Sequence, residues 1–576
     1  MNPYAPIAAK APASPVGDAS PYNPAMTLSI LRLCAGLFAA ALLGACATAP
    51  DPVAQKPRLI VFLVVDGLPQ YQLIGYRDQL APDGFARFLE RGAWFADARY
   101  AHAFTVTGAG HAVMLTGAYP HRTGIIGNDW RDRASGELVY CTQDESHTYI
   151  GHKTQKLDGT SPKNLMVETV GDVLKRADPR AKVIAISGKD RGAILPAGKN
   201  GVAYMYQAST GHFASSTYYM KEHPAWAAAF NGANPANRFF KSAWTPLLPD
   251  AAYARSLPDG QAWYNPGGKL PKVLGEADEK PGPAFYSAVM ASPYGDALTL
   301  DFARAAIQGE GLGQDDVPDI LSVSLSTHDY INHGYSPESR LSHDHLLQLD
   351  RLLQGFFADL DRMVGKDNYV AVLTADHGFS PAPEHSKSLG RNAGRQNTTE
   401  LLARINDALG QRFGEQKLAR AYSASGVLLD GATISQKKLD RRAVEEEVRR
   451  AALQEPGVAA AFTRTELENP ASLPAGTPFL AQVRKTWNRE RSADVQMLIR
   501  NYWLFESRRA FAATHGSPYA QDYTVPILFY GPRWFGAGRV DPTVEVADIA
   551  PTLARLLGVP APAAAEGKAL PLPAPR

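Results

Sequence analysis

Short apolar runs that alternate with helical patterns constrain the fold of this chain most. Residues 58–65 (RLIVFLVV) are a near-continuous apolar, β-branched run, the pattern of a strand buried on both faces. Further strand-like runs are 182–187, 318–325, 369–375 and 525–530. Helical patterns are found at 82–91, 164–177, 296–308, 336–364 and 546–557. This alternation predicts an α/β fold, a three-layer sandwich with a mostly parallel central sheet.

Charged residues follow four of these predicted strands. They are Asp66, Lys189, Asp329 and Asp376. Functional residues of open α/β sheets gather at the carboxyl ends of the strands. We therefore expect the four side chains to meet at one edge of the sheet and to form the functional site there.

The regular pattern is interrupted twice. Residues 198–295 are rich in Trp, Tyr, Asn and Pro, and residues 397–491 contain strand-like and charged helical stretches of their own. We interpret both as insertions in a single catalytic domain of residues 58–576. The Pro- and Ala-rich stretch at the C-terminus is expected to be disordered.

The first 57 residues predict export. Residues 1–25 are rich in Ala, Pro and Ser, and Met26 is a second candidate start. Arg32 then precedes an apolar run that ends in Leu43-Gly44-Ala45-Cys46. This resembles the signal and lipobox of a bacterial lipoprotein, with Cys46 as the lipidated residue and a Pro-rich tether after it. The alternative is a short transmembrane anchor at 28–45. We expect a periplasmic, membrane-anchored lipoprotein.

Charge and cysteine content exclude several classes. The 59 basic and 57 acidic residues give a net charge of +2, and no basic run or zinc-finger spacing suggests a nucleic-acid-binding module. The three cysteines are Cys34, Cys46 and Cys141. A mature lipoprotein would keep only Cys141 as a free thiol, so no internal disulfide is expected.

The segment Phe104-Thr105-Val106-Thr107-Gly108-Ala109-Gly110-His111 places a hydroxyl residue before two glycines and a helix-like run. At a helix N-terminus, free N–H groups and the helix dipole favour an anion such as phosphate. A capping Thr in a Gly-rich turn is the simpler explanation of the same letters. The segment alone leaves both readings open.

Candidate metal ligands surround this segment in the expected sheet. Asp329 and His333 are four residues apart, Asp376 and His377 are adjacent, and His515 lies further along the chain. A hydrolytic site with two metal ions needs oxygen and imidazole ligands together with open positions for the substrate. With Asp66, these residues predict such a site, and the mixture of His and Asp favours zinc.

The motifs resemble those of the alkaline phosphatase superfamily in their order along the chain. They are VVDG at 64–67, TGAGH at 107–111, HDYINH at 328–333, TADHG at 374–378 and THG at 514–516. The stretches 127–130 (GNDW) and 189–198 (KDRGAILPAG) are similar to those of the phosphate-irrepressible (PafA-type) bacterial alkaline phosphatases, whose nucleophile is Thr.

This resemblance implies roles for the residues that match the motifs. Thr107 would be the nucleophile, and Asn128, Lys189 and Arg191 would hold the phosphoryl oxygens. One of two zinc ions would take Asp329, His333 and His515. The other would take Asp66, Asp376, His377 and the Thr107 oxygen. Residues for a third, magnesium site are not found, and none is expected.

The expected activity is hydrolysis of small-molecule phosphate monoesters to inorganic phosphate. A monoester brings two negative charges and a diester one, so the cation pair Lys189 and Arg191 favours the monoester. A phosphodiesterase or nucleotide pyrophosphatase of the same superfamily is the alternative. A sulfatase lacks support because no Cys- or Ser-x-Pro-x-Arg motif is present, and a phosphoglycerate mutase-like role fits poorly with export. A non-catalytic surface lipoprotein that binds phosphorylated or glycan ligands is the alternative from another class.

Overall fold

The computed structural model describes residues 55–575. Within that range the core is one nine-stranded sheet with the order β20-β2-β19-β12-β1-β11-β6-β7-β8. Its strands are β1 Leu59–Val65, β2 Ala93–Phe95, β6 Val183–Ser187, β7 Val202–Gln207, β8 His212–Ala214, β11 Asp319–Leu325, β12 Tyr369–Thr374, β19 Ile527–Tyr530 and β20 Gly538–Val540. The five strands from β12 to β7 are parallel, and β19 and β8 are antiparallel to their inner neighbours. The predicted α/β fold with a mostly parallel sheet is confirmed.

Strand β1 lies in the middle because every one of its side chains is apolar and buried. It pairs with β11 on one side and β12 on the other, and Val65 stands opposite Leu325. Strand β11 in turn pairs Ser324 with Ser187 of β6. The carboxyl ends of these four strands are therefore level, and the residues that follow them open onto the same edge of the sheet.

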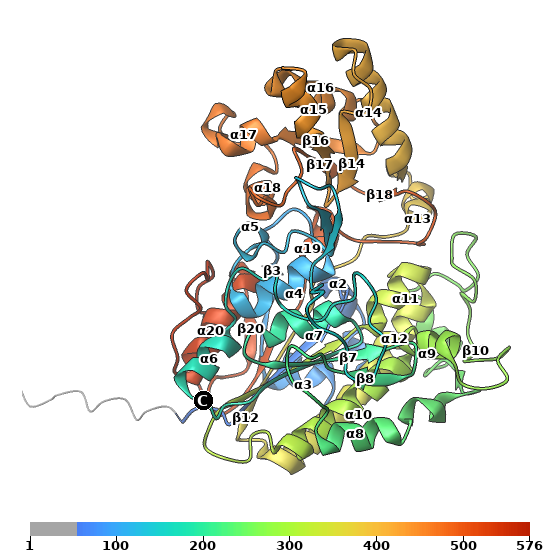
Figure 1. Cartoon of the computed structure of the whole chain (residues 1–576). Coiled ribbons are helices and arrows are strands. Elements are labelled where there is room, and N and C mark those ends of the chain that lie inside the picture. Colours follow the sequence, from blue (N-terminus) through green and yellow to red (C-terminus); the bar gives the residue numbers. More distant parts are fainter. Residues whose placement is uncertain (1–54, 576) are drawn as a thin grey trace, which may run out of the picture. The chain divides into compact units, whose positions relative to one another are not determined.

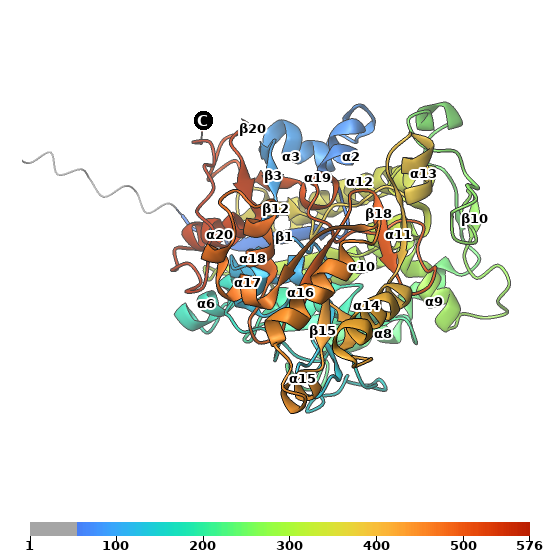
Figure 2. The ribbon, with the colours of Figure 1, turned by 90° about the horizontal axis from the view of Figure 1, so that it is seen from above.

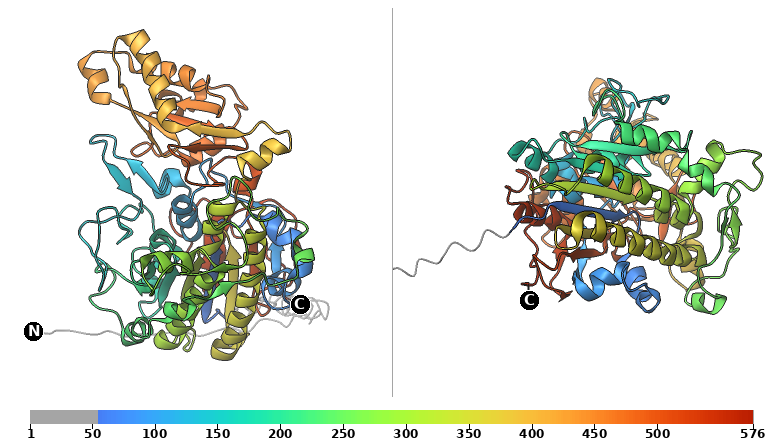
Figure 3. Two further views of the ribbon diagram at one scale, coloured as in Figure 1. Left: turned by 90° about the vertical axis from the view of Figure 1, so that its right-hand side faces the viewer. Right: turned by 90° about the horizontal axis from the view of Figure 1, so that it is seen from below.

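Helices cover both faces of the sheet (Figures 1 and 3). On one face lie α4 Thr107–Thr116, α6 Val170–Ala177, α7 Asp190–Ala197 and α20 Ile549–Leu557, and on the other α3 Phe85–Arg91, α10 Pro293–Glu310 and α12 Arg340–Leu360. Both α7 and α10 pack on β6 and β11, but from opposite sides. This is the three-layer arrangement that the sequence predicts.

Two helices start later than the sequence predicts for clear local reasons, and one helix was not predicted. Helix α6 begins at Val170 rather than 164, because Thr169 and Asp172 form a capping box there. A separate helix, α11 Thr327–Tyr335, precedes α12, which therefore starts at Arg340 under a Ser339 cap instead of at 336. Helix α7 was not expected, since Gly192 and Pro196 both argue against a helix.

The stretch 198–295 is not wholly an insertion. Strands β7 and β8 belong to the central sheet and extend it. The remainder lies outside the sheet and contains α8 Ala225–Gly232, the short pair β9 Ala243–Trp244 and β10 Lys272–Val273, and α9 Pro283–Met290. The aromatic residues of this stretch thus belong partly to the core.

A small subdomain, residues 394–506, carries its own sheet and apolar core (Figures 1 and 2, orange). The antiparallel order is β14-β15-β17-β16. Its strands are β14 Ala419–Ser423, β15 Gly426–Leu429, β16 Val458–Thr463 and β17 Val495–Ile499, and its longer helices are α14 Thr398–Phe413 and α16 Arg441–Ala452. Strand β18 Trp503–Glu506 pairs with β13 Gly394–Asn397 where the subdomain joins the core.

The C-terminal stretch is ordered against the core, contrary to the expectation of disorder. Leu570 is buried, and the Glu566 carboxylate accepts a hydrogen bond of 2.9 Å from the backbone N–H of Tyr119. At the other end, the predicted signal segment and Cys46 lie outside the described residues. Among residues 55–575, no helix has the length and apolarity needed to cross a bilayer.

Candidate active site

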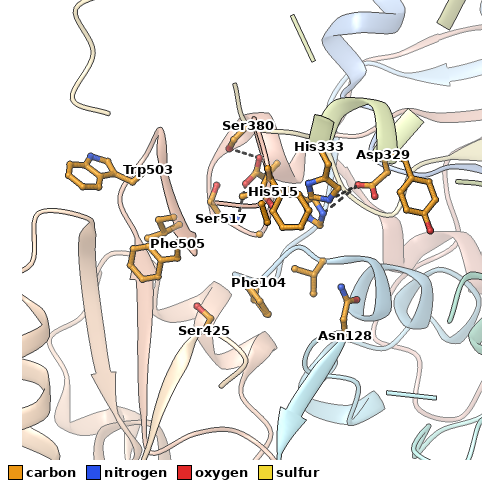
Figure 4. A pocket seen from close by; sticks show the side chains of 18 of the residues that line it. Phe104, Asn128, Asp329, His333, Ser380, Ser425, Trp503, Phe505, His515 and Ser517 are labelled. Carbon is orange, nitrogen blue, oxygen red and sulfur yellow. Dashed lines mark hydrogen bonds and ion pairs between the residues drawn. The ribbon is translucent and has the colours of Figure 1, made fainter. Parts of the chain in front are cut away.

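The level strand ends bring the predicted charged residues together. Asp66 follows β1, Lys189 follows β6, and Asp376 and His377 lie just beyond β12. Asp329 and His333 lie one turn apart on α11, directly after β11. His515 joins them from the loop before α19 (Ala520–Tyr523). The structure thus brings the predicted Asp and His ligands together in one group, in which His333 and His515 are half-buried and the others are buried. Figure 4 shows Asp329, His333 and His515 of this group.

Thr107 is the first residue of α4, as the sequence predicts for a hydroxyl at a helix N-terminus. Its side chain is buried, and Oγ1 lies 3.5 Å from Nε2 of His377. Gly110 allows this approach, because a Cβ there would stand 2.1 Å from the Asp376 carbonyl oxygen. The neighbouring Thr105 hydroxyl instead donates to the Ser517 carbonyl at 3.1 Å, which makes it part of the scaffold.

Three buried carboxylates face one another at the centre. Asp66 Oδ1, Asp329 Oδ1 and Asp376 Oδ2 find no hydrogen-bond donor among residues 55–575. Burial, with the nearby Asp376 carboxylate, raises the pKa of Asp66 well above its usual value. Like charges held this close in a dry site need a compensating cation.

The three histidines present lone pairs to these carboxylates. In each ring Nδ1 lies at hydrogen-bond distance from a backbone carbonyl: His377 from Gly378 (2.8 Å), His515 from Thr105 (2.9 Å) and His333 from Ala513 (3.1 Å). Nδ1 therefore carries the proton and Nε2 is free to bind a metal. Burial lowers the pKa of all three rings, so they are neutral at pH 7.

The distances between these acceptors leave room for metal ions. His333 Nε2 and His515 Nε2 lie 3.4 and 3.5 Å from Asp329 Oδ1. His377 Nε2 lies 3.6 Å from Asp66 Oδ1 and 3.4 Å from Asp376 Oδ2. A cation between such lone pairs compensates their repulsion, and Asp oxygen and His nitrogen atoms are both zinc ligands. The donor set therefore fits metal binding.

The candidate ligands form two groups that share Asp329. Among residues 55–575, two sets offer atoms close enough to share an ion: Asp329, His333 and His515, and Asp66, Asp329 and His377. The first set is the predicted one. The second set shares Asp66 and His377 with the predicted one and also contains Asp329. Asp376, which is predicted for the same ion, has an unpaired Oδ2 at 3.4 Å from His377 Nε2, and its other oxygen accepts from the backbone N–H of Gly67. Asp329 thus lies between the two sets.

Candidate phosphate-binding side chains line the open side of this group. Lys189 Nζ lies 2.5 Å from Asp329 Oδ2 and 2.8 Å from Asp66 Oδ2. Burial alone would lower the pKa of Lys189, but these two carboxylates raise it above its usual value, and the ammonium stays charged. Asn128 Oδ1 accepts from the backbone N–H of Gly108 at 2.7 Å. This bond fixes the Asn128 amide beside Thr107.

Known proteins resemble this chain over most of its length. Residues 60–518 match the family of type I phosphodiesterase / nucleotide pyrophosphatase. Alkaline phosphatase PafA of Elizabethkingia meningoseptica is 34% identical over 537 residues, which cover 92% of this chain and 96% of that protein. A protein of Myroides odoratus named calcium-transporting ATPase is 34% identical over 521 residues, 88% of this chain and 93% of its own. The crystal structure of wild-type PafA has a TM-score of 0.82 at 33% identity and covers 89% of this chain and 98% of its own.

The chain is a PafA-like member of the alkaline phosphatase superfamily. It is therefore an enzyme, and its membership implies a metal cofactor and small-molecule phosphate esters as substrates. The resemblance inferred from the motifs is confirmed. The roles of the individual residues stay predictions.

Two residues that position this PafA-like site were not predicted as site residues. The Tyr140 hydroxyl donates to Asp190 Oδ1 at 2.5 Å and accepts from Arg191 Nη1 at 3.1 Å. His111 lies with Nδ1 3.3 Å from Asp376 Oδ2, and it also bonds the Thr107 carbonyl. His111 was visible as part of the TGAGH motif. Tyr140 belongs to no motif, because it reaches Arg191 only through the fold.

Proposed function

We propose that this PafA-like enzyme is an exported phosphomonoesterase that uses Thr107 as its nucleophile and two zinc ions as cofactors. The single observation that carries the proposal is the position of Thr107. Its hydroxyl lies at the N-terminus of α4 and faces the His377 ring. The next residue, Gly108, donates its N–H to Asn128, which lines the adjoining cavity together with Lys189 and Arg191. A helix N-terminus and two cations favour a dianionic phosphoryl group.

The proposed reaction has two steps, which the position of Thr107 supports. Thr107 Oγ1 attacks phosphorus and loses its proton, the ester P–O bond breaks, and the leaving oxygen takes up a proton and departs as the alcohol. The product on the protein is a phosphothreonine, which water then hydrolyses to inorganic phosphate and free Thr107. Lys189, Arg191 and the Asn128 amide hold the non-bridging oxygens, whose charge is dispersed in the transition state. Loss of one preorganised donor of this kind typically costs about 3–4 kcal/mol.

The residues that would hold the metal ions are those predicted: Asp329, His333 and His515 for one, and Asp66, Asp376, His377 and Thr107 for the other. Zinc bound there supplies Lewis acidity, which lowers the pKa of a bound hydroxyl group and neutralises developing charge. The neutral imidazoles and unpaired carboxylate oxygens of this group support such binding. Elemental analysis of the purified protein tests the metal and its stoichiometry.

Trapping the intermediate tests the nucleophile. Acid quenching during turnover of para-nitrophenyl phosphate, followed by peptide mass spectrometry, should find phosphate on Thr107. Thr107→Ala should remove both the phosphopeptide and hydrolysis. Thr105→Val serves as the control and should keep both. Phosphate on Thr105, or full activity of Thr107→Ala, would show that the assignment is wrong.

The alternative is a phosphodiesterase, in line with the name of the matched family. Lys189 and Arg191 favour the monoester because two fixed cations match two negative charges better than one. Rates for para-nitrophenyl phosphate and its bis ester decide between the two. A strong preference for the diester would contradict the proposal, whereas Lys189→Ala should weaken the monoester reaction more than the diester one.

Export is the part of the proposal that rests on the N-terminal segment alone. Leu43-Gly44-Ala45-Cys46 supports lipidation at Cys46 and a periplasmic enzyme anchored by lipid. Cells that express the full chain should incorporate labelled fatty acid into it. Cys46→Ser should abolish the label and keep the phosphatase activity. Absence of label in the wild type would remove the lipoprotein assignment without affecting the reaction.

A further inference from the structure

The cavity above the candidate site is larger than a phosphate group needs. It measures about 580 Å³, within the range of about 300–1,000 Å³ typical of sites for whole small-molecule ligands. Its charged end contains Asn128, Lys189, Arg191, Asp329, His333 and His515. Aromatic side chains make up much of the remaining wall: Phe104, Tyr330, Tyr422, Trp503, Phe505 and Phe511. The charged end accounts for phosphate, and the aromatic wall requires another explanation.

Phe511 is 40% exposed although its side chain is wholly apolar. Its ring lies on the His333 ring, with centroids 4.5 Å apart and planes tilted by 37°. Tyr330, 39% exposed, lines the same cavity. Contiguous apolar surface that lines a cavity is a feature of ligand-binding grooves. The apolar wall thus reaches the candidate metal ligands.

Phe104 continues this wall next to the nucleophile. A Cβ on Gly127 would stand 3.3 Å from the Phe104 ring, and one on Gly516 would stand 3.2 Å from it. These glycines are the immediate neighbours of Asn128 and His515. The Phe104 ring therefore lies between the Asn128 loop and the His515 loop, as Figure 4 shows.

Trp503 and Phe505 supply the part of the wall that belongs to β18. They are two residues apart on one strand, so their side chains share a face. A Cβ on Gly457 would stand 2.9 Å from the Trp503 ring and 3.1 Å from the Phe505 ring. The Trp503 indole N–H also donates to Asn392 Oδ1 at 3.1 Å. Both rings are thus held in place before a ligand arrives, on the side of the cavity away from Asp329 (Figure 4).

We propose that Phe104, Trp503, Phe505 and Phe511 form an aromatic subsite for a flat ring in the alcohol part of the phosphate ester. The proposal rests on the proposed function, because the phosphoryl group must be held at the charged end. An ester joins the two ends: phosphate binds near Thr107, and a ring in the alcohol lies against the aromatic wall. Rings stack on aromatic side chains whatever their substituents. An aryl ring and a nucleobase share this chemistry.

Paired substrates test the subsite. Adenosine 5′-monophosphate and glycerol 3-phosphate both release a primary alcohol. The ratio of their kcat/KM values therefore measures the contribution of the ring to transition-state binding. Trp503→Ala should lower this ratio about tenfold, and Trp503→Phe should retain most of it. Phe413→Ala is the matched control, since Phe413 is an aromatic residue of the small subdomain that does not line the cavity. Because both rates come from one preparation, a partly misfolded variant changes both and leaves the ratio intact.

Phenyl phosphate distinguishes a subsite for aryl esters from a subsite for nucleobases. A loss of about tenfold for phenyl phosphate in Phe511→Ala, relative to glycerol 3-phosphate, would assign the subsite to aryl esters. A loss for adenosine 5′-monophosphate in Trp503→Ala would assign it to nucleobases. Ratios unchanged in Trp503→Ala, Phe505→Ala and Phe511→Ala would overturn the subsite. If the wild type hydrolyses none of the three esters, the proposed function itself is wrong.

Discussion

Among single residues, Arg191 is a clear case of a candidate phosphate ligand whose position depends on its neighbours. The Tyr140 hydroxyl holds one guanidinium nitrogen and is itself held by Asp190. Burial and the nearby Asp190 charge raise the pKa of Tyr140 well above its usual value, so the hydroxyl stays neutral and keeps its proton. Tyr140 is a positioning residue, since it acts on the substrate only through Arg191.

Tyr140→Phe should therefore weaken phosphate binding without unfolding the protein. A hydrogen bond to a charged group is worth about 1.5–3 kcal/mol, so kcat/KM for a monoester should fall at least tenfold. The inhibition constant of inorganic phosphate should rise in parallel. Tyr218→Phe, which removes a hydroxyl bonded to the Lys199 carbonyl far from the cavity, is the control. An unchanged inhibition constant in Tyr140→Phe would show that Arg191 does not need this contact.

Residues in contiguous motifs were predictable, and residues that act through the fold were not. Thr107 was visible because a hydroxyl, two glycines and an apolar run stand together in the sequence. Tyr140 and Phe104 carry no such pattern. They reach the site because the Asn128 loop and α7 meet beyond the strand ends.

Among the elements, α19 and the loop before it hold His515 through Asp522. This buried carboxylate accepts from the Ser380 hydroxyl at 2.7 Å and from the Ser517 N–H at 2.8 Å. It thereby joins the loop after β12 to the loop that carries His515. Burial raises the pKa of Asp522 to about 6, above the usual value of about 3.9.

This shift predicts a pH-dependent stability. The folded state binds the proton more tightly than the unfolded state, so the contribution of Asp522 falls as pH rises from about 4 to 6. At about 1.4 kcal/mol per pKa unit, the full shift corresponds to about 3 kcal/mol. Relative to Asp522→Asn, the wild type should lose about 2 kcal/mol of this unfolding free energy between pH 4 and pH 6. Denaturant unfolding of both proteins from pH 4 to pH 8 measures the difference. A difference that stays constant with pH would contradict the shift.

Strand ends were easier to predict than helix starts. A buried parallel strand such as β1 is a continuous apolar run, so its last residue is visible in the sequence. Helix starts depend on which of several nearby capping residues is used. Ser336-Pro337 is a good start signal in the sequence. In the structure, however, α11 ends at Tyr335 and Ser336 has a φ of 72°, so it lies between two helices and starts neither. Helix α7 stayed hidden because Gly192 and Pro196 oppose a helix that tertiary packing nevertheless stabilises.

For the whole molecule, the core architecture followed from the sequence but the makeup of the cavity did not. The central sheet is a repeated pattern, whereas the aromatic wall combines residues of the core with Trp503 and Phe505 from the small subdomain. Nothing in the pattern of residues 394–506 indicates which of its faces meets the core. Strands β7 and β8 were missed for a similar reason, since a sheet edge carries a weaker apolar signal than its centre.

The whole protein should also respond to its metal, because the charge group lies where four strands end. Removal of the metal by a chelator should lower the melting temperature and abolish activity, and if the metal is the proposed zinc, added zinc should restore both. Free zinc at 100 times its dissociation constant adds about 2.7 kcal/mol of stability.

Asp66→Asn makes this test more specific, because it should change the melting temperature in opposite directions with and without metal. Without metal, the substitution removes one of three crowded buried charges and should raise the melting temperature. With zinc present, it removes a ligand and should lower the melting temperature below that of the loaded wild type. Calorimetry of both proteins with and without zinc measures the four values. A decrease of equal size in both conditions would mean that Asp66 serves packing and not metal binding.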